Sequence, residues 1–215
     1  MITFNIDTVP LENKTVLVRV DYNIGFKNKN ITNNLKIKIS LKTIKKLLQK
    51  NCKIILATHL GRPNGKIVPE LSTKIFLSEL KKLLPKEKIS FLNDCFGKEI
   101  KSAIERSPPK SIFLLENLRF YKEEEQNDKL FAHSLAQLAQ IYINDAFAVS
   151  HRAHASTEAI THYLPSLMGP SLQTEITQMS KALHPKYPSI WIIGGAKLDK
   201  VELINQALKK ADYIL

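Results

Sequence analysis

The stretch KIILATHLGRPNGK, residues 53–66, joins a short apolar run to a loop that contains His59, Gly61, Arg62 and Gly65. Such a run, apolar almost throughout, is typical of a strand buried on both faces of a sheet. Similar runs recur at residues 15–20, 88–92, 111–116, 141–145 and 189–195. Segments with helical period separate them, at residues 33–50, 71–84, 97–105 and 128–140. The alternation predicts right-handed βαβ units, and therefore an α/β fold in which helices cover both faces of a parallel sheet.

The pattern changes near residue 162, where HYLPSLMGPS contains two prolines and a glycine. The next segment, residues 171–184, has the period of a single helix, and a new apolar run follows it. A predicted helix over 201–211 and a final short strand are too few elements to close a core of their own. We therefore expect three parts: a first domain over residues 1–168, an interdomain helix and linker over 169–188, and the start of a second α/β domain over 189–215.

The composition indicates a globular protein, because 44% of the 215 residues are hydrophobic and 24% are charged. The two cysteines, Cys52 and Cys95, have no metal-ligand spacing and are expected to pack in the core in a reducing compartment. No apolar stretch reaches the length of a membrane span, and the first residues lack the plan of a signal peptide. We therefore expect a cytoplasmic protein without a membrane partner.

The formal net charge of +12 favours anionic partners. Most of the basic residues are lysines on predicted helices, where solvated helix faces account for them. Arginine is rare in this chain, and a planar bidentate fork suits phosphate or carboxylate. The five arginines are Arg19, Arg62, Arg106, Arg119 and Arg152.

Polar side chains follow several of the predicted strands at the point where each strand ends. Because ligands of open parallel sheets bind beyond the carboxyl ends of the strands, we expect these side chains to form one anion site. Arginine forks would hold a phosphate or carboxylate there, while Asp21 and Asn23 would hold hydroxyl groups. The alternative, a basic rim for a nucleic-acid backbone, lacks interleaved aromatic residues and any known motif. The strand-end residues are Asp21, Asn23, His59, Arg62, Asn117, Arg119, Asp145, His151, Arg152 and His154.

The loop over residues 58–66 is not a nucleotide-binding P-loop. A Walker A loop has the spacing G-x-x-x-x-G-K-[ST]. Gly61 and Gly65 are one residue too close for it, and Ile67 stands where a magnesium-binding hydroxyl is required.

Five motifs together resemble phosphoglycerate kinases in order and spacing, from about residue 11 to the last residue. They are DYN (21–23), THLGRPNG (58–65), LLENLRFYKEEE (114–125), NDAFAVSHRAHAST (144–157) and IIGGAKLDK (192–200). The resemblance implies reversible phosphoryl transfer between 1,3-bisphosphoglycerate with ADP and 3-phosphoglycerate with Mg-ATP. It also implies two Rossmann-like domains, the first for the phosphoglycerate and the second for the nucleotide. In such a reaction the protein mainly positions reactants and neutralises charge.

The resemblance also implies a role for each site residue. Asp21 and Asn23 would hold the glycerate hydroxyl and the carboxylate end. Lys36, which stands where the family has a catalytic arginine, would reach the transferring phosphoryl group. Lys197 would act on the nucleotide phosphates, with Lys200 beside it. The remaining substrate-binding residues would be His59, Leu60, Gly61, Arg62, Arg119 and Arg152, and His151 and His154 would shape the pocket without holding a metal.

Three departures from the family affect the predicted activity. Lys36 supplies charge without the arginine fork, which should weaken stabilisation of the transition state. Either a general drift to lysine or a loss of selection for catalysis explains the replacement. The segment GGAKLDK is one residue shorter than the family's GGAKVSDK between Lys197 and Lys200. Separately from these departures, the acidic run Glu123–Glu125 is interpreted as a solvated loop.

The third departure is length, since the family's adenine pocket, later glycine-rich loop and magnesium-organising acid all lie beyond the matched stretch. We therefore predict a monomer that retains 3-phosphoglycerate binding but does not turn over alone. Two alternatives remain. One is a split enzyme that is active with a separately encoded second half. The other is a non-enzymatic basic module for a polyanion or a partner protein.

Overall fold

The computed structural model describes residues 5–27, 30–184, 186–194, 204–205 and 207–215. The chain divides into two compact units, Met1–Gln173 and Thr174–Leu215. The domain boundaries expected at residues 168 and 188 stay predictions.

The described part of the first unit contains a six-stranded parallel sheet in the order β5-β6-β4-β1-β7-β8. Strands β1 and β4 pair over five residues, from Thr15 opposite Lys53 to Arg19 opposite Ala57. From β1 the chain forms β4, then the edge strand β5, then β6 between these two, and it crosses to β7 on the other side of β1. This arrangement confirms the predicted Rossmann-like α/β fold. The strands are β1 (Thr15–Arg19), β4 (Lys53–Ala57), β5 (Ile89–Phe91), β6 (Ile112–Leu114), β7 (Ile141–Asn144) and β8 (Ser166–Met168).

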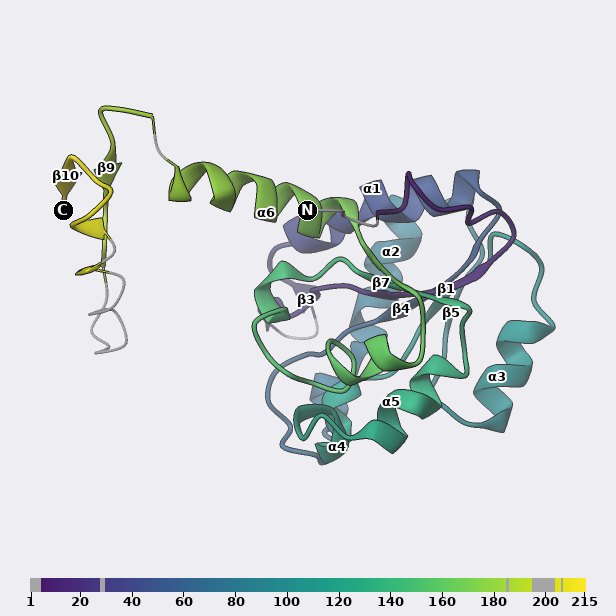
Figure 1. The fold of residues 1–215 in the computed structure, drawn as a ribbon. Helices are drawn as coiled ribbons and strands as arrows, with labels where there is room; N and C mark the ends of the chain where they lie inside the picture. The colour runs from purple at the N-terminus through teal and green to yellow at the C-terminus, as the bar shows by residue number, and fades with distance from the viewer. Residues whose placement is uncertain (1–4, 28–29, 185, 195–203, 206) are drawn as a thin grey trace. The chain divides into compact units, whose positions relative to one another are not determined.

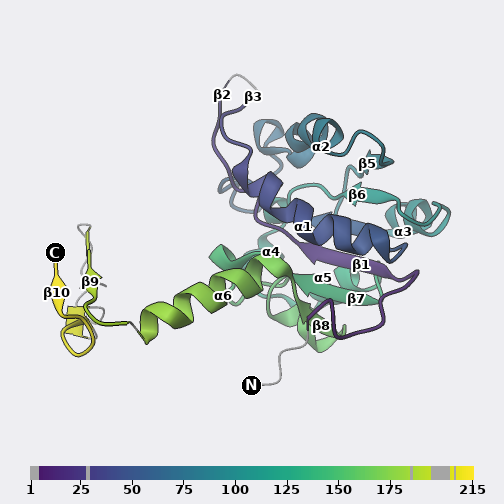
Figure 2. The same ribbon diagram turned by 90° about the horizontal axis from the view of Figure 1, so that it is seen from above.

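Helices cover both faces of this sheet, as Figures 1 and 2 show. Because successive side chains of a strand point to opposite faces, neighbouring strand residues enter different cores. Val16 and Val18 pack with helices α1 and α2, whereas Leu17 packs with α3 and α5. The helices of this unit are α1 (Leu35–Gln49), α2 (Leu77–Leu83), α3 (Lys98–Glu105), α4 (Lys122–Glu125) and α5 (Lys129–Ala136).

Three features of the first unit differ from the sequence prediction. The segment expected as one helix over 71–84 begins as two 3-10 turns. Ser72 lies between them, and its side chain caps the second turn by accepting a hydrogen bond from Lys74 N. The proline-rich segment near residue 165 holds the edge strand β8, where a proline costs no ladder hydrogen bond. A short antiparallel ladder joins β2 (Phe26–Lys27) to β3 (Asn30–Ile31). The 3-10 turns are η1 (Pro69–Leu71), η2 (Thr73–Phe76), η3 (Leu118–Phe120), η4 (Phe147–Val149) and η5 (Ala159–His162).

The second unit is described only in part. Helix α6 (Pro170–Leu183) begins in the first unit and continues into the second. Beyond it, β9 (Ile190–Trp191) pairs in parallel with β10 (Tyr213–Ile214). The helix predicted over residues 201–211 falls partly outside the described residues. Lys197 and Lys200 both lie outside them. Among the helices described in either unit, none has the length and apolar character that crossing a bilayer requires.

Candidate functional site

A basic cavity of about 110 Å³ lies beyond the carboxyl ends of the central strands. Strand β1 leads into Asp21 and Asn23, β4 into His59 and Arg62, and the turn after β6 into Arg119. The loop after β7 supplies Arg152, and helix α1 supplies Lys36. The structure thus brings together seven of the sequence-predicted site residues. The full lining is Asp21, Asn23, Lys36, His59, Arg62, Arg119, Ala148, Val149 and Arg152.

The polar end of the cavity is built around Asp21. Its Oδ2 accepts a hydrogen bond from Lys36 Nζ at 2.7 Å, and its Oδ1 accepts one from Asn23 N at 3.1 Å. Lys36 Nζ also donates to Asn23 O at 3.0 Å. The lysine is therefore tied to the carboxylate, whose side chain is 15% exposed, while its own side chain is 42% exposed.

The loop after β4 is held in place by hydrogen bonds to its backbone groups. Gly61 has φ +65°, in the left-handed region that glycine adopts at little cost, and a Cβ there would lie 2.9 Å from Leu71 Cδ2. The Gly61 N–H donates to Asn23 Oδ1 at 3.0 Å, which joins this loop to the residues after β1. Leu60 is buried in the core and does not line the cavity, and Asn117 bonds both its N–H and its carbonyl. Leu60 and Gly61 thus shape the loop from behind.

Arg119 is the most constrained cation of the cavity, with 2% of its surface exposed. Its Nη1 donates to Gly61 O at 2.9 Å, and its Nε lies 3.2 Å from Glu125 Oε1. The buried Nη2 has no hydrogen-bond partner among the described residues. An unpaired buried donor is costly, so this guanidinium has a donor left over that an acceptor beside it would satisfy.

His59 is uncharged. Burial, together with the charges of Arg19, Arg119 and Arg152, lowers its pKa to about 2. Burial also lowers the pKa of Arg119, although Glu125 opposes the shift. The cavity therefore combines arginine cations with a neutral imidazole.

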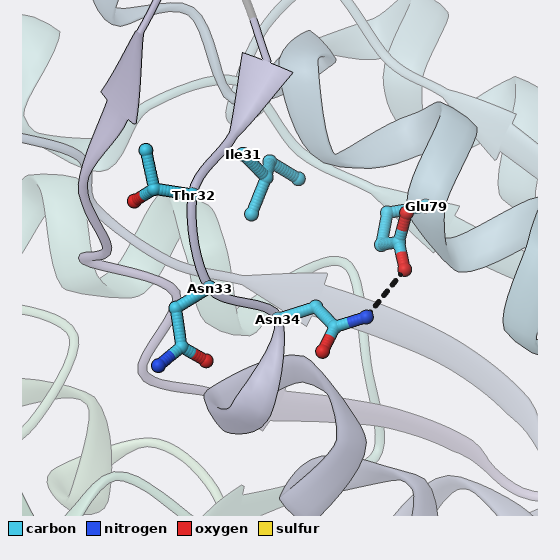
Figure 3. A pocket seen from close by; sticks show the side chains of 5 residues that line it. All are labelled: Ile31, Thr32, Asn33, Asn34 and Glu79. Carbon is cyan, nitrogen blue, oxygen red and sulfur yellow. Dashed lines mark hydrogen bonds between the residues drawn. The ribbon is translucent and has the colours of Figure 1, made fainter.

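A second pocket, shown in Figure 3, has different chemistry. It has a volume of about 310 Å³ and is lined by Ile31, Thr32, Asn33, Asn34 and Glu79. Asn34 Nδ2 donates to Glu79 Oε1 at 2.7 Å across it. A carboxylate with no cation in the lining does not attract an anion, so this pocket lacks the charge of the anion site predicted from the sequence.

Comparisons with known proteins identify the family of this chain. The family model for phosphoglycerate kinase matches residues 6–215. The chain belongs to the phosphoglycerate kinase family. A phosphoglycerate kinase of Moorella thermoacetica is 45% identical over 217 residues, which cover 100% of this chain and 55% of that protein. One of Dictyoglomus turgidum is 46% identical over 207 residues, which cover 95% of this chain and 52% of that protein.

Solved structures of phosphoglycerate kinases have the same fold. The structure from Coxiella burnetii has a TM-score of 0.85 at 33% identity, over 99% of this chain and 54% of that one. The structure from Pyrococcus horikoshii OT3 has a TM-score of 0.88 at 28% identity, over 99% and 54%. The chain spans about half the length of the phosphoglycerate kinases it matches.

Four strand-end residues that the sequence placed in one anion site do not line the basic cavity, and Asp145 and Asn117 are two of them. Asp145 is buried and accepts hydrogen bonds from Thr43 Oγ1 and from the N–H and hydroxyl of Ser171. Burial raises its pKa, which these hydrogen bonds oppose. Asn117 is buried and bonds the backbone of Leu60 and Leu71. Both residues hold elements together and do not line the cavity, because their polar atoms already have partners.

The interpretation of residues 123–125 as a solvated loop is wrong for Glu124, which is fully buried. Its carboxylate accepts from Ser156 N at 3.0 Å and from Ser156 Oγ at 2.6 Å. His154 is also buried, 3.9 Å from Glu124, while His151 is exposed, and neither lines the cavity. The described residues contain no group of three or more His, Cys, Asp or Glu side chains arranged to hold a metal ion.

Arg19 is the residue that sequence reasoning missed. It ends strand β1, is fully buried, and bonds His59 Nδ1 through Nη2 at 3.0 Å. The signal was available, because a charged residue inside the apolar run TVLVRV must find buried partners. Its partner Ser156, and Glu124 beyond that hydroxyl, are far away in sequence, so the signal did not say what Arg19 does.

Proposed function

We propose that this chain binds 3-phosphoglycerate in the basic cavity and presents it for phosphoryl transfer with Mg-ATP. The observation that carries the proposal is the lining of this cavity, which contains three arginines, one of which, Arg119, has a buried Nη2 without a protein partner in the described residues. Arg62, Arg119 and Arg152 would hold the anionic groups of the triose through bidentate hydrogen bonds. Asp21 and Asn23 would accept from and donate to its hydroxyl group.

In this proposal the substrate's own carboxylate attacks or leaves, so the chain needs no covalent nucleophile. Lys36 would supply positive charge towards the transferring group once the ligand displaces it from Asp21. A Mg-nucleotide, when bound, supplies the phosphoryl group and part of its charge neutralisation. The family resemblance assigns Lys197 and Lys200 to that nucleotide, and both lie outside the described residues. The basic cavity is therefore assigned to the triose.

Calorimetry with 3-phosphoglycerate tests the binding. We expect saturable heat from the folded wild-type chain, and affinity at least tenfold weaker in Arg62→Gln, because a charged bidentate contact is lost. Arg106→Gln is the matched control, since Arg106 is exposed at the end of α3 and does not line the cavity. Absence of heat at millimolar ligand from a folded sample rejects the proposal, as does equal weakening by both variants.

Turnover is a separate proposal. Because the matched phosphoglycerate kinases are about twice as long, we propose that the 215-residue polypeptide does not catalyse transfer alone. A coupled ATP-dependent assay of the purified chain checks this, and clear turnover contradicts it. Activity that appears only on mixing with a separately produced second half would identify a split enzyme. Salt-sensitive binding to nucleic acid without competition by 3-phosphoglycerate would instead favour the polyanion-binding module.

A further inference from the structure

Arg19 touches the cavity only through His59. Its three nitrogens each donate to a different group: Nε to Ser156 Oγ at 2.9 Å, Nη1 to Val20 O at 2.7 Å and Nη2 towards His59 Nδ1 at 3.0 Å. It does not line the cavity, whereas His59 does. Arg19 therefore does not contact a ligand there, and its influence on the site passes through the imidazole.

The chemistry of this contact fixes the histidine's proton. A guanidinium only donates hydrogen bonds, so His59 Nδ1 must offer its lone pair. A neutral imidazole with an unprotonated Nδ1 carries its proton on Nε2. The ring therefore has an N–H donor on the nitrogen that Arg19 leaves available.

A buried carboxylate balances the charge of Arg19. Ser156 Oγ accepts from Arg19 Nε and donates to Glu124 Oε1 at 2.6 Å, so one hydroxyl separates guanidinium from carboxylate. All three groups are fully buried. A buried cation without such a partner would be strongly destabilising. The chain Glu124–Ser156–Arg19–His59 thus runs from helix α4 to the cavity wall.

We propose that Arg19 is a positioning residue that fixes His59 as a neutral Nε2–H donor towards the ligand in the cavity. The role rests on the proposed function of the cavity as a triose site. A neutral donor recognises a carboxylate or phosphoester oxygen without adding a charge that depends on pH. The charged and titratable groups that act on His59 are Arg19 from β1, Arg119 from η3, and Arg152 and His154 from the loop after β7. Asp21, Lys36 and Arg62 line the same cavity, and Glu124 from α4 lies beyond Ser156.

Nitrogen-15 NMR of the wild-type chain tests the tautomer directly, with His59→Gln used only to assign the signal. We expect a neutral ring protonated at Nε2, with an unprotonated hydrogen-bonded Nδ1, that does not titrate between pH 8 and about 5. A ring protonated at Nδ1, or one that titrates near its ordinary pKa, overturns the proposal. This measurement needs no ligand and no variant of Arg19.

Binding measurements test the positioning role. Arg19→Met should weaken 3-phosphoglycerate binding about fivefold to tenfold and allow an Nδ1-protonated ring, because one oriented hydrogen bond is lost. Arg19→Lys should restore part of both, since its ammonium can still donate to Nδ1. Arg106→Met is the matched control and should change neither. A folded Arg19→Met chain with unchanged ring signals and unchanged affinity overturns the role.

Two further outcomes remain informative. If Arg19→Met does not fold, Ser156→Ala removes only the hydroxyl that orients Arg19, and the same changes should appear in weaker form. If the wild-type ring is protonated at Nε2 but no 3-phosphoglycerate binds, the proposed function fails while the assignment of the tautomer stands. Unchanged ring signals in Ser156→Ala count against the chain of contacts from Glu124.

Discussion

Asp21 and Asp145 each follow one of two neighbouring parallel strands, β1 and β7, yet their surroundings differ. Asp21 lines the basic cavity and accepts from Lys36 Nζ, whose side chain is 42% exposed. Asp145 is buried and accepts from Thr43 on α1 and from Ser171 in the first turn of α6. A strand-end aspartate therefore lines a cavity where the neighbouring chain leaves it room, and holds the fold together where a helix begins against it.

The largest expected difference between the two aspartates is in stability. Asp145→Ala should lower the free energy of unfolding of the first unit by about 3 kcal/mol, because Thr43 Oγ1 and Ser171 N lose a buried acceptor. Asp21→Ala should cost less than about 1 kcal/mol, because its ion pair with Lys36 is partly exposed. Urea unfolding followed by far-UV circular dichroism measures both, since the single tryptophan, Trp191, lies in the second unit. Similar losses in the two variants would show that the two strand ends are equivalent.

Acid distinguishes the two regions a second time, because burial acts on His59 and Asp145 with opposite consequences. The pKa of His59 falls from 6.5 to about 2 in the folded state, so the unfolded chain binds more protons between these values. Stability should therefore fall by about 2 kcal/mol between pH 7 and pH 5 through His59. The raised pKa of Asp145 acts in the other direction. At a pH above the unfolded value of 3.8, the folded chain binds this proton more tightly than the unfolded chain, so stability rises through Asp145 as the pH falls.

Urea titrations at pH 7 and pH 5 measure this slope. His59→Gln should lose most of the acid sensitivity, and His151→Gln, a matched change at an exposed histidine, should keep it. Equal slopes in wild type and His59→Gln would exclude a charge change on His59 as the cause.

The sequence predicted the parallel sheet well because its signals are local. Apolar runs such as KIILA and TVLVRV mark buried strands, and the carboxyl ends of parallel strands meet at one edge. That reasoning brought His59, Arg62 and Arg119 to one site, where the structure places them. The reasoning is reliable wherever the position of a side chain follows from the position of its strand.

Partners that are distant in sequence were not predictable in the same way. Arg19 lies 137 residues from Ser156, and Glu124 lies 32 residues from it, so no spacing marks their buried chain of contacts. Glu124 is one of three consecutive glutamates, and nothing in their composition separates the buried one from its neighbours. Asp145 was misplaced for the same reason, since its partner Thr43 lies 102 residues away.

The smallest expected effect concerns Lys36, on the Asp21 side of the comparison, and it rests on the cavity being a triose site. Lys36 Nζ is a point charge held at 2.7 Å from Asp21, so a ligand must compete with that carboxylate for it. An arginine can donate to Asp21 and to a ligand oxygen at once, because its donors are arranged in a fork. Lys36→Arg should therefore strengthen 3-phosphoglycerate binding about threefold, with stability changed by less than about 0.5 kcal/mol.

Calorimetry of Lys36→Arg against Lys38→Arg, an exposed neighbour on the same helix, separates the fork from a general gain of arginine. Equal affinities in both variants would show that the ligand does not reach Lys36. Weaker binding in Lys36→Arg would show that the pocket has become fitted to lysine, because the bulkier guanidinium then displaces Asp21 instead of sharing it. Equal affinities would place the anion nearer to Arg62 and Arg152 than to Asp21, since those arginines keep their charge in every variant, whereas weaker binding would place it beside Asp21.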